Sequence, residues 1–376
     1  MKIAIVHDEL VRRGGAEQFT LILHKAFPEA PIYTSTYNIK KTYEAFASTN
    51  IRSTWLTNIA KNEKMLKRLF FPFGILAMKS HYLENYDIVL MSTTTSAKYV
   101  RVKPGTLIIA YCHYPFRLLW FPDSYIQGTK IRSIKSILLK ILIGIFKKMD
   151  YKAAKKIDEF ITNTPEIARI INTCYEPKNP VSVMYSSISC SNFYVESNPT
   201  EDYYLLISRV EPYKKVDIAI DAFNKMPNKK LIIAGKGSRK EHYQKTANSN
   251  IEFRENLSKE EVAKLYANCK AFIFPQQEDY GLTPIEANAS GRPVVAYGRG
   301  GITYTTIPYT SDSKNSTAIY FEEQTPECLI KAIELVETLE FDPVFIRKHA
   351  EKFDESFFIE NIRNFVNEKF NKWNKQ

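Results

Sequence analysis

The alternation of short apolar runs with helical stretches is the feature that most constrains how this chain can fold. In the second half, apolar runs of strand length are separated by 10 to 25 residues that carry the period of a helix. These runs cover residues 203–208, 231–234, 251–253, 271–275 and 293–297. Strands that alternate with helices in this way build βαβ units, so the pattern predicts a parallel sheet.

The first half repeats the pattern with longer and more basic connections. Its apolar runs cover residues 2–7, 31–36, 87–92, 107–113 and 159–163. A chain of 376 residues also exceeds the size of about 250 to 300 residues at which single cores stop growing. We therefore predict an α/β protein of two Rossmann-like domains, whose parallel sheets face each other across a cleft.

A stretch rich in Ser and Asn, residues 182–199, lies between the two series of runs and is the expected linker. We place the N-terminal domain at residues 1–185 and the C-terminal domain at residues 186–345. Residues 346–376 carry the period of a helix with a broad face rich in phenylalanine. Because such a face needs a large surface to pack against, we expect this helix to return to the N-terminal domain.

The excess of positive over negative charge is confined to the first half of the chain. Residues 1–185 carry a net charge of +13, whereas residues 186–376 carry −2. This asymmetry points to an anionic partner for the first half, either nucleic acid or a membrane surface. In residues 61–79 and 130–156, Lys and Arg flank apolar clusters, a pattern of interfacial helices and also of buried amphipathic helices. We expect an anionic membrane surface and no nucleic acid.

Cysteine usage and hydropathy indicate the compartment. The five cysteines are scattered and form no framework for disulfides or zinc. The first nine residues lack the basic start and the apolar length of a secretory signal. Lys140 interrupts the longest apolar run, which is too short to cross a bilayer. We expect a cytoplasmic protein, peripheral at the inner face of the cell membrane.

The loops that follow the strands should carry the chemistry, since ligands of open parallel sheets bind beyond the carboxyl ends of the strands. In the first half, Gly14 and Gly15 open a helix, where backbone amides either cradle phosphate or only form a tight turn. His113 ends the fourth run and should face the cleft, as a structural hydrogen-bonding group or as a catalytic one.

Two loops of the second half are more informative. Arg209 and Lys214 share the loop after the first run, where two cations suit a diphosphate or form a solvated basic loop. The loop after 271–275 contains Glu278 and Gly281 before a helix that is expected to open at Pro284. Thr283 as the N-cap and Glu286 three residues later would form a capping box, which explains Glu286 as structure but leaves Glu278 unexplained.

These segments together resemble the retaining glycosyltransferase family 4 of the GT-B fold, and especially bacterial O-antigen-type mannosyltransferases. The resemblance rests on two glutamates separated by seven residues, Glu278 and Glu286, and on the segment S-R-x-E-P-Y-K at 208–214. It extends to H-D-x-L at 7–10, G-G-A-E at 14–17 and Y-C-H-x-P at 111–115. Glu9 stands where the family has an aromatic residue.

The resemblance implies a retaining, metal-independent hexosyltransferase without a cofactor. The donor would be a nucleotide sugar, GDP-mannose by resemblance or alternatively a UDP-sugar, and the acceptor a lipid-linked or surface-polysaccharide glycan. A basic nucleic-acid-binding protein is the rival class. By resemblance, the donor diphosphate is held by Gly15, Arg209, Lys214, Gly281 and Leu282, the ribose by Glu286, and the transferred sugar by Glu278 and His113.

Overall fold

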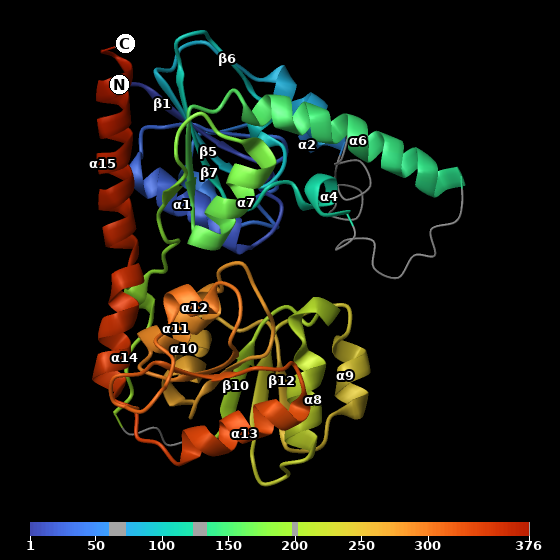
Figure 1. Ribbon diagram of the computed structural model, residues 1–376, viewed down its shortest axis with the longest axis vertical. Helices are drawn as coiled ribbons and strands as arrows, with labels where there is room; N and C mark the ends of the chain where they lie inside the picture. Colours follow the sequence, from blue (N-terminus) through green and yellow to red (C-terminus); the bar gives the residue numbers. More distant parts are fainter. Residues whose placement is uncertain (60–72, 123–133, 198–201, 376) are drawn as a thin grey trace. The chain divides into compact units, whose positions relative to one another are not determined.

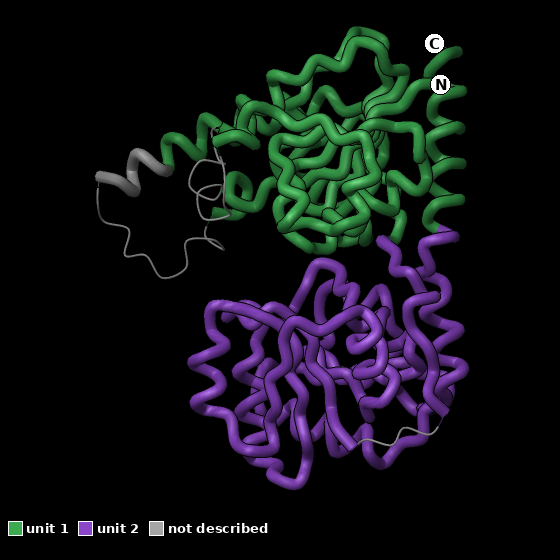
Figure 2. Tube along the Cα trace, turned by 180° about the vertical axis from the view of Figure 1, so that it is seen from behind, with its two compact units in different colours: residues 1–185, 358–376 green, residues 186–357 purple. Residues whose placement is uncertain are grey.

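The computed structural model describes residues 1–59, 73–122, 134–197 and 202–375. The chain forms two compact units (Figure 2). Unit 1 consists of Met1–Tyr185 and Phe358–Gln376, and unit 2 consists of Ser186–Phe357. The basic stretch 61–79, for which an interfacial helix was one prediction, lies mostly outside the described residues.

Unit 1 is built on a parallel sheet with the strand order β3-β2-β1-β5-β7-β8-β9. The strands are β1 (Ile3–His7), β2 (Ile32–Thr34), β3 (Ile51–Ser53), β5 (Ile88–Thr93), β7 (Leu107–Cys112), β8 (Glu159–Thr162) and β9 (Ser182–Val183), with a separate pair β4 (Tyr82–Leu83) and β6 (Arg101–Val102). The helices are α1 (Gly15–Ala26), α2 (Leu56–Ile59), α4 (Arg117–Trp120), α6 (Ile134–Ala154), α7 (Pro165–Tyr175) and α15 (Glu355–Trp373), with short 3-10 helices η1 (Glu44–Ser48) and η2 (Ala97–Tyr99).

Both faces of the unit 1 sheet are covered, and strand periodicity decides which residue faces which layer. Ile5 packs with α1 and α15, whereas its neighbour Val6 packs with α6 and α7. This alternation follows from the two-residue period of a strand. Helices on both faces require continuous apolar strands, which is why all five residues of β1 are buried (Figure 1).

Unit 2 repeats the architecture with the strand order β12-β11-β10-β13-β14-β15. The strands are β10 (Tyr204–Ile207), β11 (Leu231–Ala234), β12 (Ile251–Arg254), β13 (Phe272–Phe274), β14 (Val294–Tyr297) and β15 (Ala318–Phe321). The helices are α8 (Val216–Asn224), α9 (Lys240–Thr246), α10 (Lys259–Asn268), α11 (Leu282–Ala289), α12 (Ile302–Thr305), α13 (Pro326–Glu337) and α14 (Pro343–Ala350), with 3-10 helices η3 (Cys190–Asn192), η4 (Pro212–Lys214) and η5 (Glu351–Phe353). The predicted α/β class with two Rossmann-like parallel sheets is confirmed.

The C-terminal segment differs from the single helix expected at 346–376. Residues up to Phe357 belong to unit 2, where α14 packs against α11 and Phe353 is buried. Asp354 breaks the helix, because its carboxylate accepts hydrogen bonds from the amides of Ser356 at 3.0 Å and Cys190 at 2.9 Å. The part that packs on unit 1 therefore begins at Phe358, twelve residues later than expected.

Candidate active site

Lys214 and Glu278 meet at the carboxyl ends of β10 and β13 in unit 2. The Lys214 ammonium forms an ion pair with Oε1 of Glu278, and the two side chains are 13% and 26% exposed. The same oxygen accepts a hydrogen bond from Nε2 of Gln276 at 3.1 Å. From the sequence, Lys214 was expected to hold the donor diphosphate and Glu278 the transferred sugar. The structure pairs the two residues, and it places them where ligands of parallel sheets bind.

The loop that carries Lys214 is tied to the next loop of the sheet. Glu211 accepts hydrogen bonds from the amide and the hydroxyl of Ser238 at 3.0 and 2.6 Å. A Cβ atom at Gly237 would lie 2.1 Å from the Val210 carbonyl oxygen, so only glycine permits this approach. Arg209 is exposed on the same loop, with its guanidinium 5.6 Å from the ring centre of Tyr213.

The backbone around Glu278 is fixed by a pair of glycines after β14. The carbonyl of Glu278 accepts a hydrogen bond from the Gly301 amide at 2.8 Å. Added Cβ atoms at Gly300 and Gly301 would lie 2.3 Å from the Glu278 carbonyl oxygen and 2.2 Å from Cα of Tyr280. These contacts explain why the loop after β14 contains adjacent glycines, and they hold Glu278 at the end of the sheet.

The capping box predicted for α11 is wrong. The helix begins at Leu282, its N-cap is Gly281 with φ of 88°, and no side chain caps it. Glu286 does not reach back to the helix start, because it accepts a hydrogen bond from the Tyr266 hydroxyl at 2.8 Å. The first amides of α11 therefore have no side-chain cap, which leaves the positive end of the helix dipole available to an anion.

Glu286 instead forms a partly buried polar pair with the buried Tyr266 on α10. Burial raises the pKa of Glu286, and the hydrogen bond from Tyr266 opposes this rise. Tyr266 is fully buried between Phe193 and Phe272. Sequence reasoning missed Tyr266, since an aromatic residue at helical spacing is typical of a core position.

His113 follows β7 in unit 1 and is held by strand β5. Its Nε2 lies 3.0 Å from the Ser92 hydroxyl. Burial lowers the pKa of His113 to about 3, with a further lowering from His7 and an opposing effect of Asp8. The ring packs edge-on against Phe19, with centres 4.9 Å apart. At neutral pH His113 is a neutral imidazole in a defined orientation.

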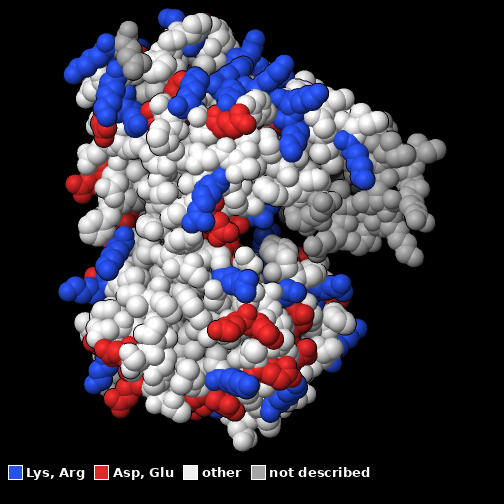
Figure 3. Space-filling model, in the orientation of Figure 1, with Lys and Arg blue, Asp and Glu red and all other residues white. Residues whose placement is uncertain are grey.

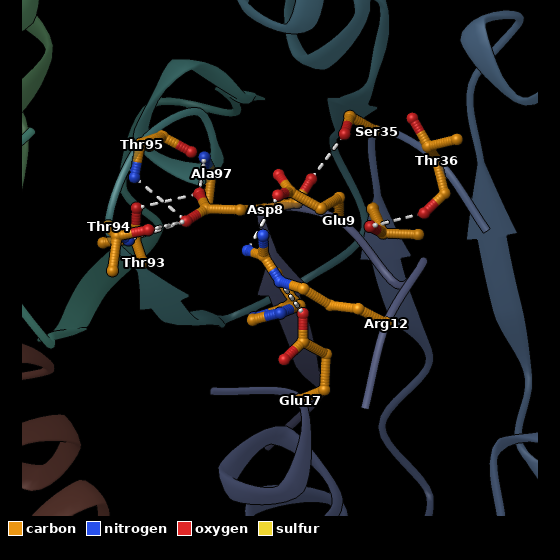
Figure 4. A network of polar contacts seen from close by, with 12 residues as sticks. Asp8, Glu9, Arg12, Glu17, Ser35, Thr36, Thr93, Thr94, Thr95 and Ala97 are labelled. Atoms are coloured by element: carbon orange, nitrogen blue, oxygen red, sulfur yellow. Dashed lines mark hydrogen bonds and ion pairs between the residues drawn. The ribbon is translucent and has the colours of Figure 1, made fainter. Parts of the chain in front are cut away.

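Asp8 organises the loop after β5 (Figure 4). Its carboxylate accepts hydrogen bonds from the amides of Thr94, Thr95 and Ala97 at 2.6, 2.9 and 2.7 Å, and from the hydroxyls of Thr93 and Thr94 at 3.1 and 2.9 Å. Burial alone would raise the pKa of Asp8, but His7 and these amides lower it. Asp8 is a structural residue of this edge, a role that the sequence pattern did not reveal.

Gly15 starts α1 and is exposed. In the first turn of this helix, the buried Glu17 pairs with Arg12 at 2.9 Å, and Arg12 also contacts Glu9 at 3.0 Å (Figure 4). A Cβ atom at Gly14 would lie 2.6 Å from Oε2 of Glu17, so the glycine pair fits a tight turn around this carboxylate. Glu9, which departs from the family pattern, thus belongs to a carboxylate–guanidinium cluster.

Among the residues that the structure describes, no group of three or more His, Cys, Asp or Glu side chains is arranged to hold a metal ion.

Comparison with known proteins agrees with this arrangement. Residues 192–356 match the family "Glycosyl transferases group 1". The alpha-1,3/1,6-mannosyltransferase ALG2 of Candida glabrata is 23% identical over 94% of this chain and 88% of its own length. The O-antigen chain mannosyltransferase RfbU of Salmonella typhimurium is 24% identical over 60% of each chain.

Solved structures show the same fold over nearly the whole chain. Sucrose-phosphate synthase from Thermosynechococcus elongatus aligns over 99% of this chain and 100% of its own, with a TM-score of 0.74 and 14% identity. HepE of Anabaena, in complex with UDP-glucose, aligns over 98% of this chain and 100% of its own, with a TM-score of 0.70 and 14% identity. The chain is thus a glycosyltransferase with the GT-B fold, and its residues 192–356 are similar to the group 1 glycosyl transferases.

Proposed function

We propose that the chain is a retaining mannosyltransferase that moves mannose from GDP-mannose to a lipid-linked or surface-polysaccharide glycan. The observation that carries the site assignment is the Lys214–Glu278 ion pair beside the uncapped start of α11. The mannosyl group is supported by relatives named mannosyltransferases, ALG2 and RfbU. A UDP-sugar is the alternative donor, and an experiment must distinguish it from GDP-mannose.

The ion pair suggests how the free site is prepared for its donor. A diphosphate would replace Glu278 as the partner of Lys214, with Arg209 on the same loop and the amides of Leu282 and Thr283 as further donors. Glu278, freed from Lys214, would accept hydrogen bonds from hydroxyls of the transferred sugar. Gly281 lets the chain turn into α11 at a positive φ, and Glu286 would bind the ribose.

The chemistry that follows depends on charge and position. Arg supplies a planar fork of donors and Lys a compact charge, so the two can neutralise a leaving diphosphate, and we propose transfer without a divalent metal. In unit 1, we propose that His113 contacts the transferred sugar and that Gly15 approaches the diphosphate. As a neutral imidazole, His113 would act by hydrogen bonding and by its dipole, with neither His113 nor Glu278 as a covalent nucleophile.

A donor panel tests the proposal directly. Purified protein is titrated with GDP-mannose and with other GDP-, UDP- and ADP-sugars, with and without EDTA, while thermal stability and hydrolysis are measured. A donor at one hundred times its Kd should add about 2.7 kcal/mol to the free energy of unfolding. A stronger response to UDP-sugars would replace the GDP-mannose assignment, and no response to any sugar nucleotide would refute the donor site.

A matched pair of variants tests the role of Lys214. Lys214→Met should lower turnover by about 100- to 1,000-fold, the loss typical for removing a group that stabilises developing charge. Lys229→Met is the control, because Lys229 pairs with Glu337 in the same unit and the two side chains are 24% and 30% exposed. Equal activity of the two variants would contradict the diphosphate assignment.

We further propose that unit 1 binds the anionic inner surface of the cell membrane through α6. This helix exposes Ile141, Leu142 and Ile145, which are 55%, 38% and 51% exposed. Its only acidic residue, Asp150, is buried and pairs with Lys98 at 3.0 Å, so the exposed charge of α6 is positive. Lys and Arg also predominate among the charged side chains on the visible face of unit 1, whereas both signs are mixed on unit 2 (Figure 3).

Within residues 1–59, 73–122, 134–197 and 202–375, no helix has the length and apolar character needed to cross a bilayer. Because the exposed charge of α6 is positive, co-sedimentation with vesicles that contain phosphatidylserine should depend on charge and fall steeply with added salt. Replacing Ile141 and Ile145 by Ser should weaken binding, whereas a Val344→Ser variant, at a 70% exposed apolar position of unit 2, should not. Absence of binding at every salt concentration, or preference for duplex DNA over vesicles, would contradict membrane binding.

A further inference from the structure

The hydroxyl of Ser92 connects two histidines inside unit 1. Ser92 is fully buried on β5, between β1 and β7 of the sheet. Its Oγ lies 3.0 Å from Nε2 of His113 and 3.1 Å from Nδ1 of His7. Nδ1 of His7 also lies 3.1 Å from the carbonyl oxygen of Ser92 and 2.9 Å from the hydroxyl oxygen of Thr20.

These contacts determine where the hydrogen atoms lie. A carbonyl oxygen only accepts, so the contact with the Ser92 carbonyl requires a proton on Nδ1 of His7. The hydroxyl of Thr20 donates to the Ala16 carbonyl at 2.9 Å, and its oxygen can then accept from His7. The Ser92 hydroxyl has no need to donate to His7, which leaves its proton for Nε2 of His113.

His113 must then be the tautomer that is protonated on Nδ1. Its Nε2 accepts from Ser92, and Nδ1 makes no hydrogen bond with any residue that the structure describes. The packed rings of Phe19 and Tyr111, with centres 4.9 and 5.1 Å from that of His113, restrict the position of the imidazole but leave both tautomers sterically equal. Only the hydrogen-bond partners distinguish the two tautomers.

We propose that Ser92 is a positioning residue that holds His113 as the Nδ1–H tautomer and so presents an N–H donor to the transferred sugar. The proposal rests on the proposed role of His113 in sugar contact. An N–H donor at this place suits an oxygen of the sugar, either a hydroxyl or the ring oxygen, whereas the opposite tautomer would present a lone pair. Ser92 acts through His113 and does not touch the substrate itself.

The tautomer is measured in the free protein by long-range ¹H–¹⁵N correlation of the histidine side chains. The signal of His113 is identified by its absence in a His113→Gln variant, since the chain has only six histidines. The wild type should show His113 with a proton on Nδ1 alone. In Ser92→Ala the tautomers should mix, and Ser92→Thr, which keeps the hydroxyl, should restore the Nδ1–H form. If the added methyl group prevents folding, the tautomers of the wild type and of Ser92→Ala decide the proposal by themselves.

Turnover provides the second measurement. Ser92→Ala should lower kcat by about 10- to 100-fold, the range observed when a partner that orients a metal-bound histidine is removed. The KM for the donor should change less than about twofold, because the diphosphate and ribose contacts are intact. Thr20→Val should have a smaller effect, since Thr20 contacts His7 and Ser92 but not His113. Ser316→Ala, at a serine of unit 2 that is 3% exposed, is the control for the loss of a buried hydroxyl.

Two results in the free protein would overturn the proposal, and neither depends on the donor: an Nε2–H tautomer of His113 in the wild type, or an unchanged tautomer in Ser92→Ala. A third such result would come from turnover. If the protein transfers no sugar but shows these tautomers, the proposed function fails while the hydrogen-bond assignment stands. If the tautomers are as expected but Ser92→Ala turns over as the wild type does, the positioning role is wrong.

Discussion

The Tyr266–Glu286 hydrogen bond should contribute more to the stability of unit 2 than a similar hydrogen bond made by another tyrosine, Tyr204. Tyr266→Phe removes a buried hydroxyl that donates to a partly buried carboxylate at 2.8 Å, and the ring contacts with Phe193 and Phe272 remain. A hydrogen bond to a charged group contributes about 1.5–3 kcal/mol, so we expect the free energy of unfolding to fall by about 2 kcal/mol. For a unit of about 170 residues this corresponds to a Tm lower by about 4–8 °C.

Tyr204→Phe is the matched control. Tyr204 is 1% exposed and also donates to a carboxylate at 2.8 Å, that of Glu337. Glu337 is 30% exposed and pairs with Lys229, so water and another partner replace the lost hydroxyl. We expect a loss of no more than about 1 kcal/mol. Urea denaturation followed by circular dichroism measures both variants under identical conditions.

The dependence on pH sharpens the comparison. Burial raises the pKa of Glu286, so the folded protein binds its proton more tightly than the unfolded chain does, and this group lowers stability as the pH rises above about 4.3. Without Tyr266 the pKa rises further, and the stability difference between wild type and Tyr266→Phe should grow in that range above pH 4.3.

Glu337 has the opposite shift. Burial would raise its pKa, but Lys229 and Tyr204 lower it. The difference between wild type and Tyr204→Phe should therefore change below about pH 4.3. Donor titration completes the test, because Tyr266→Phe should also weaken donor binding through Glu286. Equal losses for the two variants, or a Tyr266→Phe difference that does not change above pH 4.3, would refute the reasoning.

Three further outcomes are expected. Glu278→Gln should lower turnover at least as much as Lys214→Met does. Because the ion pair is partly exposed, the free energy of unfolding should change by no more than about 1 kcal/mol. Full activity with the best donor of the panel would contradict the sugar contact. Asp8→Asn should cost about 2–4 kcal/mol at pH 7, because one amide group cannot replace five accepted hydrogen bonds. This cost should shrink as the pH falls through the lowered pKa of Asp8, and a cost in urea denaturation that is the same at pH 3 and pH 7 would contradict the assignment. Gly281→Ala should lower the free energy of unfolding by about 1–2 kcal/mol, since φ is 88° and the new methyl carbon would lie 3.1 Å from the Phe274 ring. A thermal stability equal to that of the wild type would show that the turn relaxes freely.

Most strands were predictable because each appears in the sequence as a local run of apolar residues. Each apolar run of the sequence coincides with an observed strand to within two residues, as in 231–234 and β11 (Leu231–Ala234). The edge strands β3 (Ile51–Ser53), β9 (Ser182–Val183) and β15 (Ala318–Phe321) were missed, as was the separate pair β4 and β6. No residue of β3 or β9 is fully buried, whereas β15 is largely buried but has only four residues. A strand at a sheet edge needs fewer apolar residues, so its pattern is weak.

The errors in predicting the site have a different origin: a side chain can bond either to a group nearby in the sequence or to one that only the fold brings close. Thr283, Pro284 and Glu286 satisfy every local requirement of a capping box, yet Glu286 is bonded by Tyr266, which lies twenty residues earlier in the sequence. Likewise, Ser92 lies in β5 and His113 directly after β7, and only the register of the two strands brings them together. Pattern reasoning located these loops, but which side chains pair across strands depends on tertiary packing.

The discontinuity of unit 1 also determines when it can fold during synthesis. Phe358, Ile362 and Val366 complete the apolar layer around Phe19, and Arg363 donates to the Ala26 carbonyl at the end of α1. Unit 2 is contiguous in sequence and can fold once residue 357 has left the ribosome. Unit 1, although made first, must wait with one face of its sheet only partly covered, by α1, until residues 358–376 arrive. The first half of the chain is thus the part that needs protection from aggregation during translation.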